Sequence, residues 1–249
     1  MLTLGGRGGT ETGFKGITTM ISSAVVSTVR ELKPRFFEGL APAELKIILN
    51  AATKRRFLEG SVITDQGHPS NHLFLLLQGS ARYFYLTQEG QKILLRWLPP
   101  GEIFGGSALL RRHSEYKMST EMVKGGCVLE WNRATIRGLA LRYPRVLENV
   151  LEIVSDYLDG YVAVHISLTC HTARQRLARV LVTLASGIGR RVPGGVELTV
   201  SNEDLANAAN MTPFTASRLL SGWQRSGMLV KSRGRILLCS PERLLLHEV

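Results

Sequence analysis

The sequence contains few cysteines and no long apolar segment. Its three cysteines, Cys127, Cys170 and Cys239, lie far apart and form no CxxC pair or metal-ligand cluster. We therefore expect neither a disulfide framework nor a metal site. No apolar run approaches the roughly 20 residues that a membrane-spanning helix needs, and the glycine-rich residues 1–16 lack the apolar stretch of a secretion signal. These absences predict a cytoplasmic protein.

Motifs that carry enzymatic chemistry are also missing. The chain has no phosphate-binding GxxxxGK, no zinc-binding HExxH and no GxSxG nucleophile elbow. The segment GEIFGG at residues 101–106 is interpreted as a turn between strands, because no βαβ unit surrounds it. We therefore expect no catalytic activity. A ligand-binding module that regulates another protein is a competing class.

Acidic residues are scarce beside basic ones. The chain has 31 Lys and Arg against 20 Asp and Glu, with a net charge of +11 and a pI of about 10.0. Residues 169–249 alone carry 11 basic and 5 acidic side chains. This charge favours an anionic partner, and nucleic acid is a better candidate than a membrane surface.

Residues 201–225, SNEDLANAANMTPFTASRLLSGWQR, have the pattern of a helix-turn-helix. Ser201 is the expected N-cap of a first helix, and Asp204 places a carboxylate in its first turn. Asn210 interrupts the pattern, because Asn tolerates the left-handed conformation of a sharp turn. Thr212 then caps a second helix that begins with a proline. Such a second helix enters the major groove of DNA N-terminus first.

A basic β-hairpin, or wing, is predicted directly after this second helix. Residues 229–230 and 236–238 are strand-like and flank the turn KSRGR at residues 231–235. An ordinary helical hairpin is the alternative interpretation of the helix-turn-helix pattern alone, and the positive wing beside it favours DNA. The predicted phosphate contacts are Thr212, Thr215, Gln224, Lys231, Arg233 and Arg235.

Residues 34–143 alternate short apolar runs with glycines. Seven strand-like runs recur, and glycines such as Gly79 are expected to form the turns between them. This spacing predicts an antiparallel β-roll whose interior can hold one small ligand. Residues 1–33 ahead of the roll are predicted to be a flexible leader. The strand-like runs are residues 56–58, 61–64, 73–77, 81–86, 93–98, 117–122 and 127–131.

Residues 144–168 are predicted to form one long dimerisation helix. Seven side chains along it repeat at alternating spacings of four and three, which is the heptad seam of a helix that pairs with another helix. A helix packed only on its own domain is the alternative. We favour a symmetric homodimer, which places two recognition helices about one DNA turn apart and suits a palindromic operator. The seam residues are Leu147, Leu151, Val154, Leu158, Tyr161, His165 and Leu168.

The order of these parts resembles the Crp–Fnr family of bacterial transcription regulators. The resemblance runs from Phe36 to Leu246 and is carried by LLLQGSARYFY, GQKILLRWLPPGEIFGG and TASRLLSGWQRSGMLVKSRGRILL. The last segment is similar to the anaerobic-regulator branch. The resemblance implies an α+β fold with an N-terminal antiparallel β-roll sensor domain, a dimerisation helix, and a winged helix-turn-helix over residues 169–249. It also implies RNA polymerase as a partner.

The DNA-reading helix departs from the family pattern. That pattern resembles S/T-R-E-T-V-G/S-R, whereas this chain has TPFTASR at residues 212–218. Arg218 is retained and is the expected reader of guanine. Phe214 replaces a Glu that accepts from cytosine, so we expect a half-site different from the family's TGTGA or TTGAT. The expected base contacts are Arg218, Ser217, Phe214 and Pro213.

The effector site departs further. Cyclic-AMP-binding members resemble one another in a Glu that holds the ribose and an Arg-Ser pair that holds the phosphate, but Gly106 and Tyr116-Lys117 stand at these positions. A ribose hydroxyl or a phosphate that is buried without a protein partner weakens the binding free energy by on the order of several kcal/mol. We therefore predict that the protein does not bind cyclic AMP tightly. The candidate effector-pocket residues are Gly105, Gly106, Ser107, Tyr116, Lys117, Tyr161 and Val162.

The sequence leaves open which effector, if any, the protein binds. The iron–sulfur cluster of oxygen-sensing members needs cysteines mostly ahead of the roll, and no cysteine precedes Cys127, so we do not expect this cofactor. A regulator gated by haem or another small molecule, and an effector-independent regulator, are the alternatives. The candidate haem ligands are His68, His72, His113, His165 and His171.

Overall fold

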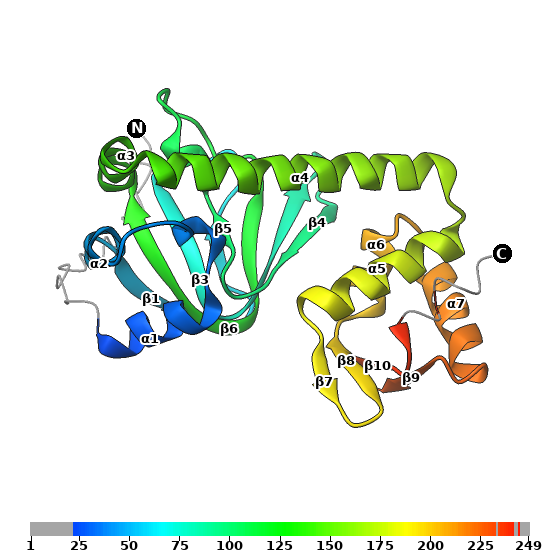
Figure 1. Cartoon of the computed structure of the whole chain (residues 1–249). Helices are drawn as coiled ribbons and strands as arrows, with labels where there is room; N and C mark the ends of the chain where they lie inside the picture. Colours follow the sequence, from blue (N-terminus) through cyan, green and yellow to red (C-terminus); the bar gives the residue numbers. More distant parts are fainter. Residues whose placement is uncertain (1–21, 233, 242–243, 245–249) are drawn as a thin grey trace, which may run out of the picture.

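The computed structural model describes residues 22–232, 234–241 and 244. An N-terminal antiparallel β-roll is joined by the long helix α4, Pro144–Cys170, to a smaller domain of helices and short strands (Figure 1). The predicted α+β fold with a β-roll, a long helix and a winged helix-turn-helix is confirmed. In the described part of the chain, no helix is both long and apolar enough to cross a membrane.

The roll is one six-stranded sheet. Four strands follow the order β1-β6-β3-β4, while β2 pairs with β6 and β5 pairs with β3. All of these pairings are antiparallel. The strands are β1 (Thr53–Phe57), β2 (Val62–Thr64), β3 (His72–Leu86), β4 (Lys92–Leu98), β5 (Ile103–Phe104) and β6 (Ser119–Asn132).

The two longest strands differ from the prediction. Residues 73–77 and 81–86 were expected to be separate strands, yet both belong to β3, and β6 likewise unites two predicted runs. Gly79 is not a turn: it has a φ of 91°, and its strand shifts register against β6 without ending. Opposite it, a Cβ on Gly126 would lie 1.9 Å from the carbonyl oxygen of Gln78. Glycine here lets two continuous strands bend while their backbones touch.

Helices cover one side of the roll. In α1 (Ser23–Leu32), Val25 and Val29 are buried in the same apolar core as Trp131, whose indole nitrogen donates to the Ile48 carbonyl at 2.8 Å. The flexible leader predicted for residues 1–33 is therefore wrong for this helix, and residues 1–21 lie outside the described residues. The other elements of this layer are η1 (Arg35–Phe37), α2 (Pro42–Asn50) and α3 (Arg133–Arg142), together with the start of α4.

The second domain has its own core. The apolar side chains of Leu205, Leu220 and Trp223 are buried in it. The wing was predicted, but the hairpin of β7 (Arg190–Val192) and β8 (Gly195–Thr199) was not; β8 pairs with β10 and extends the wing into a four-stranded sheet of order β7-β8-β10-β9. The remaining elements are α5 (Ala173–Gly187), α6 (Asn202–Ala208), α7 (Pro213–Arg225), β9 (Leu229–Ser232) and β10 (Arg235–Leu238).

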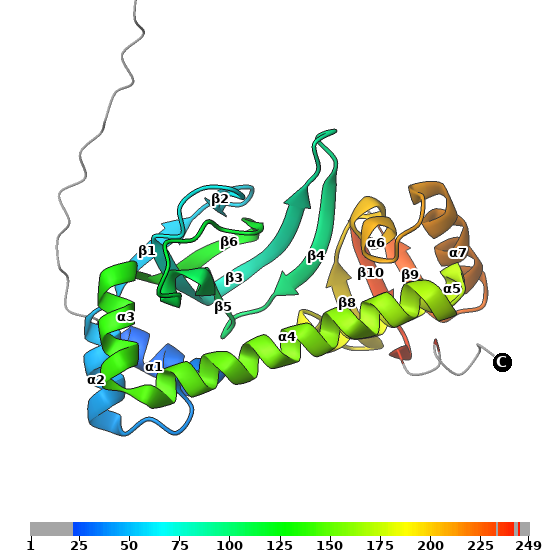
Figure 2. The same cartoon turned by 90° about the horizontal axis from the view of Figure 1, so that it is seen from above.

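The two domains are connected through α4 (Figure 1), and they also touch where β4 lies beside α6. Helix α4 reaches from the roll to the second domain, and the chain then turns into α5 (Figure 1). Seen from above, β4 also lies beside α6, while α7 lies at the end of the molecule away from the roll (Figure 2). The second helix of the helix-turn-helix is thus presented at the far end.

Candidate nucleic-acid interface

The helix-turn-helix is built by local capping. The Ser201 hydroxyl accepts the backbone N–H of Asp204 at 3.0 Å, and that of Thr212 accepts the N–H of Thr215 at 3.2 Å. Between the helices, Asn210 has a φ of 47°, the left-handed conformation that makes the turn tight. These contacts fix where α6 and α7 begin, and they agree with the caps expected from the sequence.

An arginine that the sequence pattern does not reveal holds the turn in place. Arg176 of α5 donates from Nε to the Ala209 carbonyl at 2.8 Å and from Nη2 to the Asn210 carbonyl at 3.0 Å. Its Nη1 also donates to the carbonyl of His171 at 2.9 Å, in the α4–α5 connection. One guanidinium therefore ties the interdomain connection to the turn ahead of α7.

One face of α7 is turned to solvent. Phe214 is 77% exposed, and Arg218, one helical turn later, is also exposed. The opposite face, with Ala216, Leu220 and Trp223, is buried in the domain core. Helix α7 therefore presents an aromatic ring and a guanidinium to solvent on the face opposite the core. Of the other predicted contacts on and around this helix, Thr212, Pro213 and Gln224 are exposed, while Thr215 and Ser217 are half-buried.

The wing carries less unpaired charge than the sequence suggested. The side chain of Arg235 is exposed, but its Nη1 lies 3.7 Å from Glu197 on β8. Arg190 of β7 lies 2.6 Å from the same carboxylate, and this hydrogen bond holds the pKa of Glu197 below its usual range. Lys231 is half-buried on β9, and Arg233 lies outside the described residues. The unpredicted β7–β8 hairpin thus adds basic side chains to the same sheet.

The predicted seam lies mostly on the exposed side of α4. Leu151, Val154 and Leu158 are 68%, 54% and 62% exposed, and His165 and Leu168 are exposed too. Leu147 differs, because it packs partly against the roll's own core. The opposite face of the helix, which includes Val150 and Ile153, is buried on the roll.

The turn at the predicted effector site is built from close backbone contacts. Gly105 has a φ of 75°, and a Cβ there would lie 2.5 Å from the carbonyl oxygen of His72. Gly106 begins the short helix η2, Gly106–Leu109, and the Ser107 hydroxyl lies 2.8 Å from that of Ser70.

The remaining predicted effector residues do not gather into one polar site. The Tyr116 hydroxyl is engaged by the backbone of His72, with both the N–H and the carbonyl at 3.1 Å. Lys117 is exposed, and so is Val162 on α4. The Tyr161 hydroxyl lies 3.6 Å from the sulfur of Met118.

A tyrosine is buried in the interior next to that turn. Tyr83 is buried among Leu98, Phe104 and Met122, and burial raises the pKa of its hydroxyl well above the ordinary value. Tyr83 lies in LLLQGSARYFY, one of the segments that carry the family resemblance, but no sequence pattern marks it as a buried residue.

The candidate haem ligands are spread over different elements. His72 is paired, with its Nε2 3.1 Å from the carboxylate of Glu130. Among the described residues, no group of three or more His, Cys, Asp and Glu side chains is arranged to hold a metal ion. The other candidates are His68, near Asp65 at 3.4 Å; His171, near Ser167 at 3.0 Å; and the exposed His113 and His165.

Comparisons with known proteins match both domains. The family model for the cyclic nucleotide-binding domain matches residues 54–143, and that for the Crp-like helix-turn-helix domain matches residues 175–246. Together these matches cover more than half of the chain. A curated relative, the cyclic AMP receptor protein of Thermus thermophilus, is 29% identical over 213 residues, which is 86% of this chain and 95% of the relative.

Solved structures agree with the family models. A transcriptional regulator of the CRP family, also from Thermus thermophilus, is 27% identical with a TM-score of 0.65, over 76% of this chain and 94% of that one. The c-di-GMP responsive global regulator CLP from Xanthomonas campestris has a TM-score of 0.71 at 19% identity, over 80% of this chain and 100% of that one. At 19% identity, the similarity to the Xanthomonas campestris protein shows a shared fold only.

Proposed function

Because the chain belongs to the Crp–Fnr family of DNA-binding transcription regulators, we propose that it acts as a homodimer that reads a palindromic operator without cyclic AMP. The observation that carries this proposal is the exposed face of α7, where Arg218 and Phe214 project from a helix whose other face is buried. Arg218 reads guanine through its two-pronged guanidinium, and Phe214 packs on the methyl group of thymine. Pro213 and Ser217 complete the base-facing surface.

The backbone contacts come from the caps and the sheet beside α7. Thr212 and Thr215 lie at the N-terminus of α7, where the helix dipole favours a phosphate. Gln224, Lys231, Arg233 and Arg235 are the further phosphate contacts in this proposal. Because Arg235 already faces Glu197, it attracts phosphate less strongly than an unpaired arginine would.

The dimer forms along α4. Leu151, Val154 and Leu158 make an exposed apolar stripe on a helix whose other side already covers the roll. Such a stripe at heptad spacing is stable in water when a second copy covers it. Two parallel copies of α4 bring their α7 helices to the same end of the dimer, where successive major grooves can be read.

The residues around Gly105 do not fit a cyclic nucleotide. Gly106 offers no carboxylate for the ribose, and the Tyr116 hydroxyl is already engaged by the backbone of His72. Tyr83 fills the adjoining interior. Although a relative carries the name cyclic AMP receptor protein, we propose that this chain has lost that ligand.

An effector-independent regulator is the version that the contacts favour. Tyr157 of α4 donates a 2.6 Å hydrogen bond to Glu102 of the roll, so the chain's own groups link the long helix to the roll. Gating by haem or by another small molecule is the alternative. The protein acts in the cytoplasm, where the chromosome is, with RNA polymerase as its partner in activation.

A competition binding assay tests the proposed function. Purified full-length protein without added ligand is mixed with labelled fragments of its own genome and a large excess of random-sequence competitor. We expect a subset of fragments to stay bound, and Arg218→Ala to lose that subset while keeping weak binding to all DNA. Equal retention of every fragment by the unchanged protein would contradict the proposal.

A further inference from the structure

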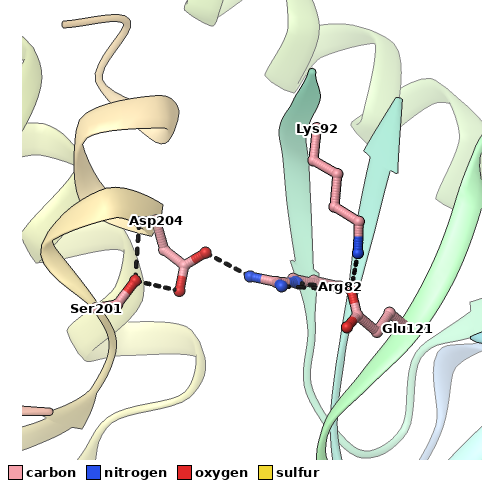
Figure 3. A network of polar contacts seen from close by, with 5 residues as sticks. All are labelled: Arg82, Lys92, Glu121, Ser201 and Asp204. Atoms are coloured by element: carbon pink, nitrogen blue, oxygen red, sulfur yellow. Dashed lines mark hydrogen bonds and ion pairs between the residues drawn. The ribbon is translucent and has the colours of Figure 1, made fainter. Parts of the chain in front are cut away.

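The roll touches the helix-turn-helix directly, apart from the α4–α5 connection. Arg82 of β3 forms an ion pair with Asp204 of α6 (Figure 3). Both side chains are only 21% exposed, so the pair is partly shielded from water. The two residues are 122 positions apart in the sequence.

On the roll, Arg82 also faces the negative charge of Glu121. Nη2 of Arg82 lies 3.3 Å from Glu121 of β6, and Nζ of Lys92 lies 3.2 Å from the same carboxylate oxygen. Lys92 and Arg82 therefore share Glu121, and the Nη1 end of Arg82 is directed to Asp204 (Figure 3). The direct contact with Glu121 holds Arg82 in one orientation toward α6.

The contact reaches the cap of α6. The Asp204 carboxylate also accepts a 2.8 Å hydrogen bond from the hydroxyl of Ser201, which in turn accepts the Asp204 backbone N–H. A carboxylate in the first turn of a helix is itself favoured by the helix dipole. The roll thus contacts Asp204, which is hydrogen-bonded to the N-cap residue Ser201 at the start of the helix-turn-helix.

An apolar contact accompanies the ion pair. Trp97 of β4 belongs to the roll, yet its partly buried ring packs against the core of the second domain. The interface between them is not tightly filled, because a pocket of about 200 Å³ remains beside Arg82, lined also by Phe84, Leu94 and Asn207. The Arg82–Asp204 pair and the Trp97 ring therefore both connect the roll to the second domain beside this pocket.

The contact leaves the DNA-reading surface open. Helix α7 lies at the end away from the roll in both views (Figures 1 and 2), and Arg218 is exposed. We infer that Arg82 and Asp204 are positioning residues, which hold the helix-turn-helix at the angle required for both half-sites of an operator. This inference rests on the DNA binding proposed above.

Loss of the contact leaves the second domain attached mainly through the connection at His171. Each domain then samples more orientations, and the apparent affinity for DNA falls with the fraction that is correctly placed. We expect Arg82→Gln and Asp204→Asn each to weaken operator binding about three- to tenfold, the size of effect a partly shielded ion pair can have. The double variant should be little worse than either single one, because both remove the same contact.

If only the net charge of each variant mattered, the DNA affinities of the variants would change differently. Asp204→Asn removes a negative charge from the DNA-binding domain, which by itself would tighten binding to DNA. The positioning role requires that it weakens binding instead. Lys92→Gln is the matched control for Arg82→Gln: it removes one positive charge that contacts Glu121 but does not reach Asp204. We expect the control to bind the operator within about twofold of the unchanged protein, because one distant charge contributes little once salt screens it.

Half-site spacing separates positioning from a general structural effect. Operators with the half-sites moved apart or together by one base pair should bind the unchanged protein poorly, while Arg82→Gln should discriminate among them about threefold less. Hydrogen–deuterium exchange without DNA gives a second readout. Peptides that contain Trp97 and α6 should exchange faster in both variants and not in Lys92→Gln.

The outcomes separate the two proposals. If the unchanged protein binds its operator and both variants match it in affinity, spacing preference and amide exchange, the positioning role is wrong while the proposed function stands. If the unchanged protein binds no DNA, the proposed function fails, and amide exchange still decides whether the pair holds the domains together. Tighter DNA binding by both variants would show that the contact restrains the domain and would also overturn the inference.

Discussion

The hydroxyl of Tyr157 on α4 donates a 2.6 Å hydrogen bond to the carboxylate of Glu102 in the roll. The guanidinium of Arg96 lies 4.1 Å over the Tyr157 ring and 3.6 Å from Glu102. Burial, and then the charge of Glu102, raise the pKa of Tyr157 well above its usual value, so that it stays a donor. These three side chains join α4 to the roll.

Tyr157→Phe should weaken this link. Glu102 loses its closest partner in a partly buried place, so we expect the free energy of unfolding to fall by about 1 kcal/mol. Urea denaturation at pH 8 measures the change. Tyr161→Phe is the control, because its hydroxyl has only a 3.6 Å contact to the Met118 sulfur. Equal losses in the two variants would contradict a special role for the Tyr157–Glu102 bond.

The same substitution should change the response to alkali. A tyrosine whose folded pKa is raised stabilises the fold fully below its unfolded pKa, about 10, and this contribution is lost as the pH rises further. The unfolding free energy of the unchanged protein should therefore fall more steeply above about pH 10 than that of Tyr157→Phe. Parallel slopes between pH 8 and pH 11 would show that Tyr157 is not held protonated.

Arg235→Gln should weaken binding to all DNA sequences alike. The residue is proposed to meet phosphate, so its loss should lower the slope of log K against log salt by about one, or less because Glu197 already faces it. Titrations of one operator and one unrelated duplex at several salt concentrations measure this slope. Lys54→Gln removes a charge from β1 of the roll and is the control. A loss confined to the operator would instead indicate base contact.

Leu158→Glu should disrupt the dimer. The side chain is 62% exposed on the apolar stripe of α4, and a charge there would face its own copy across the seam. We expect a monomer by light scattering at micromolar concentration, with the circular dichroism of the fold retained. Leu141→Glu, at an exposed position of α3 outside the stripe, should stay dimeric. A dimer in both variants would place the interface elsewhere.

Cyclic AMP should not bind tightly. Gly106 and Tyr116 offer neither the carboxylate nor the arginine that the ligand needs, and Tyr83 occupies the neighbouring interior. Isothermal titration calorimetry of the full-length protein should detect no binding at micromolar ligand concentrations. A micromolar or tighter dissociation constant would mean that the roll rearranges around a ligand, and the effector-independent version of the proposal would be wrong.

What the sequence predicted well depends on local chemistry. Ser201, Asn210 and Thr212 act within three or four residues of themselves, so the caps and the turn of the helix-turn-helix can be read directly from the chain. The periodicity of α4 is equally local: it indicated a helix over residues 144–168, and the structure has one over Pro144–Cys170. The DNA-facing roles of Arg218 and Phe214 came instead from the family resemblance, and both side chains are exposed.

What the sequence could not show depends on distant pairs. Nothing near Arg82 or Asp204 indicates that a strand of the roll meets the cap of α6, because the pairing exists only once both domains have folded. Arg176 is a similar case, since its three carbonyl partners come from two separate segments. For α1, by contrast, the sequence did contain evidence of a packed helix, because Val25 and Val29 lie one helical turn apart and share the buried face.

Selection from random duplex DNA by the full-length protein without added ligand tests directly whether α7 reads an operator. We expect a palindrome whose half-site contains the guanine read by Arg218 and has no cytosine preference at the base pair that faces Phe214. Phe214→Glu, selected in parallel, should gain that cytosine preference. If the recovered DNA showed no enriched sequence, or an unchanged TGTGA or TTGAT half-site, the proposed DNA reading by α7 would be wrong.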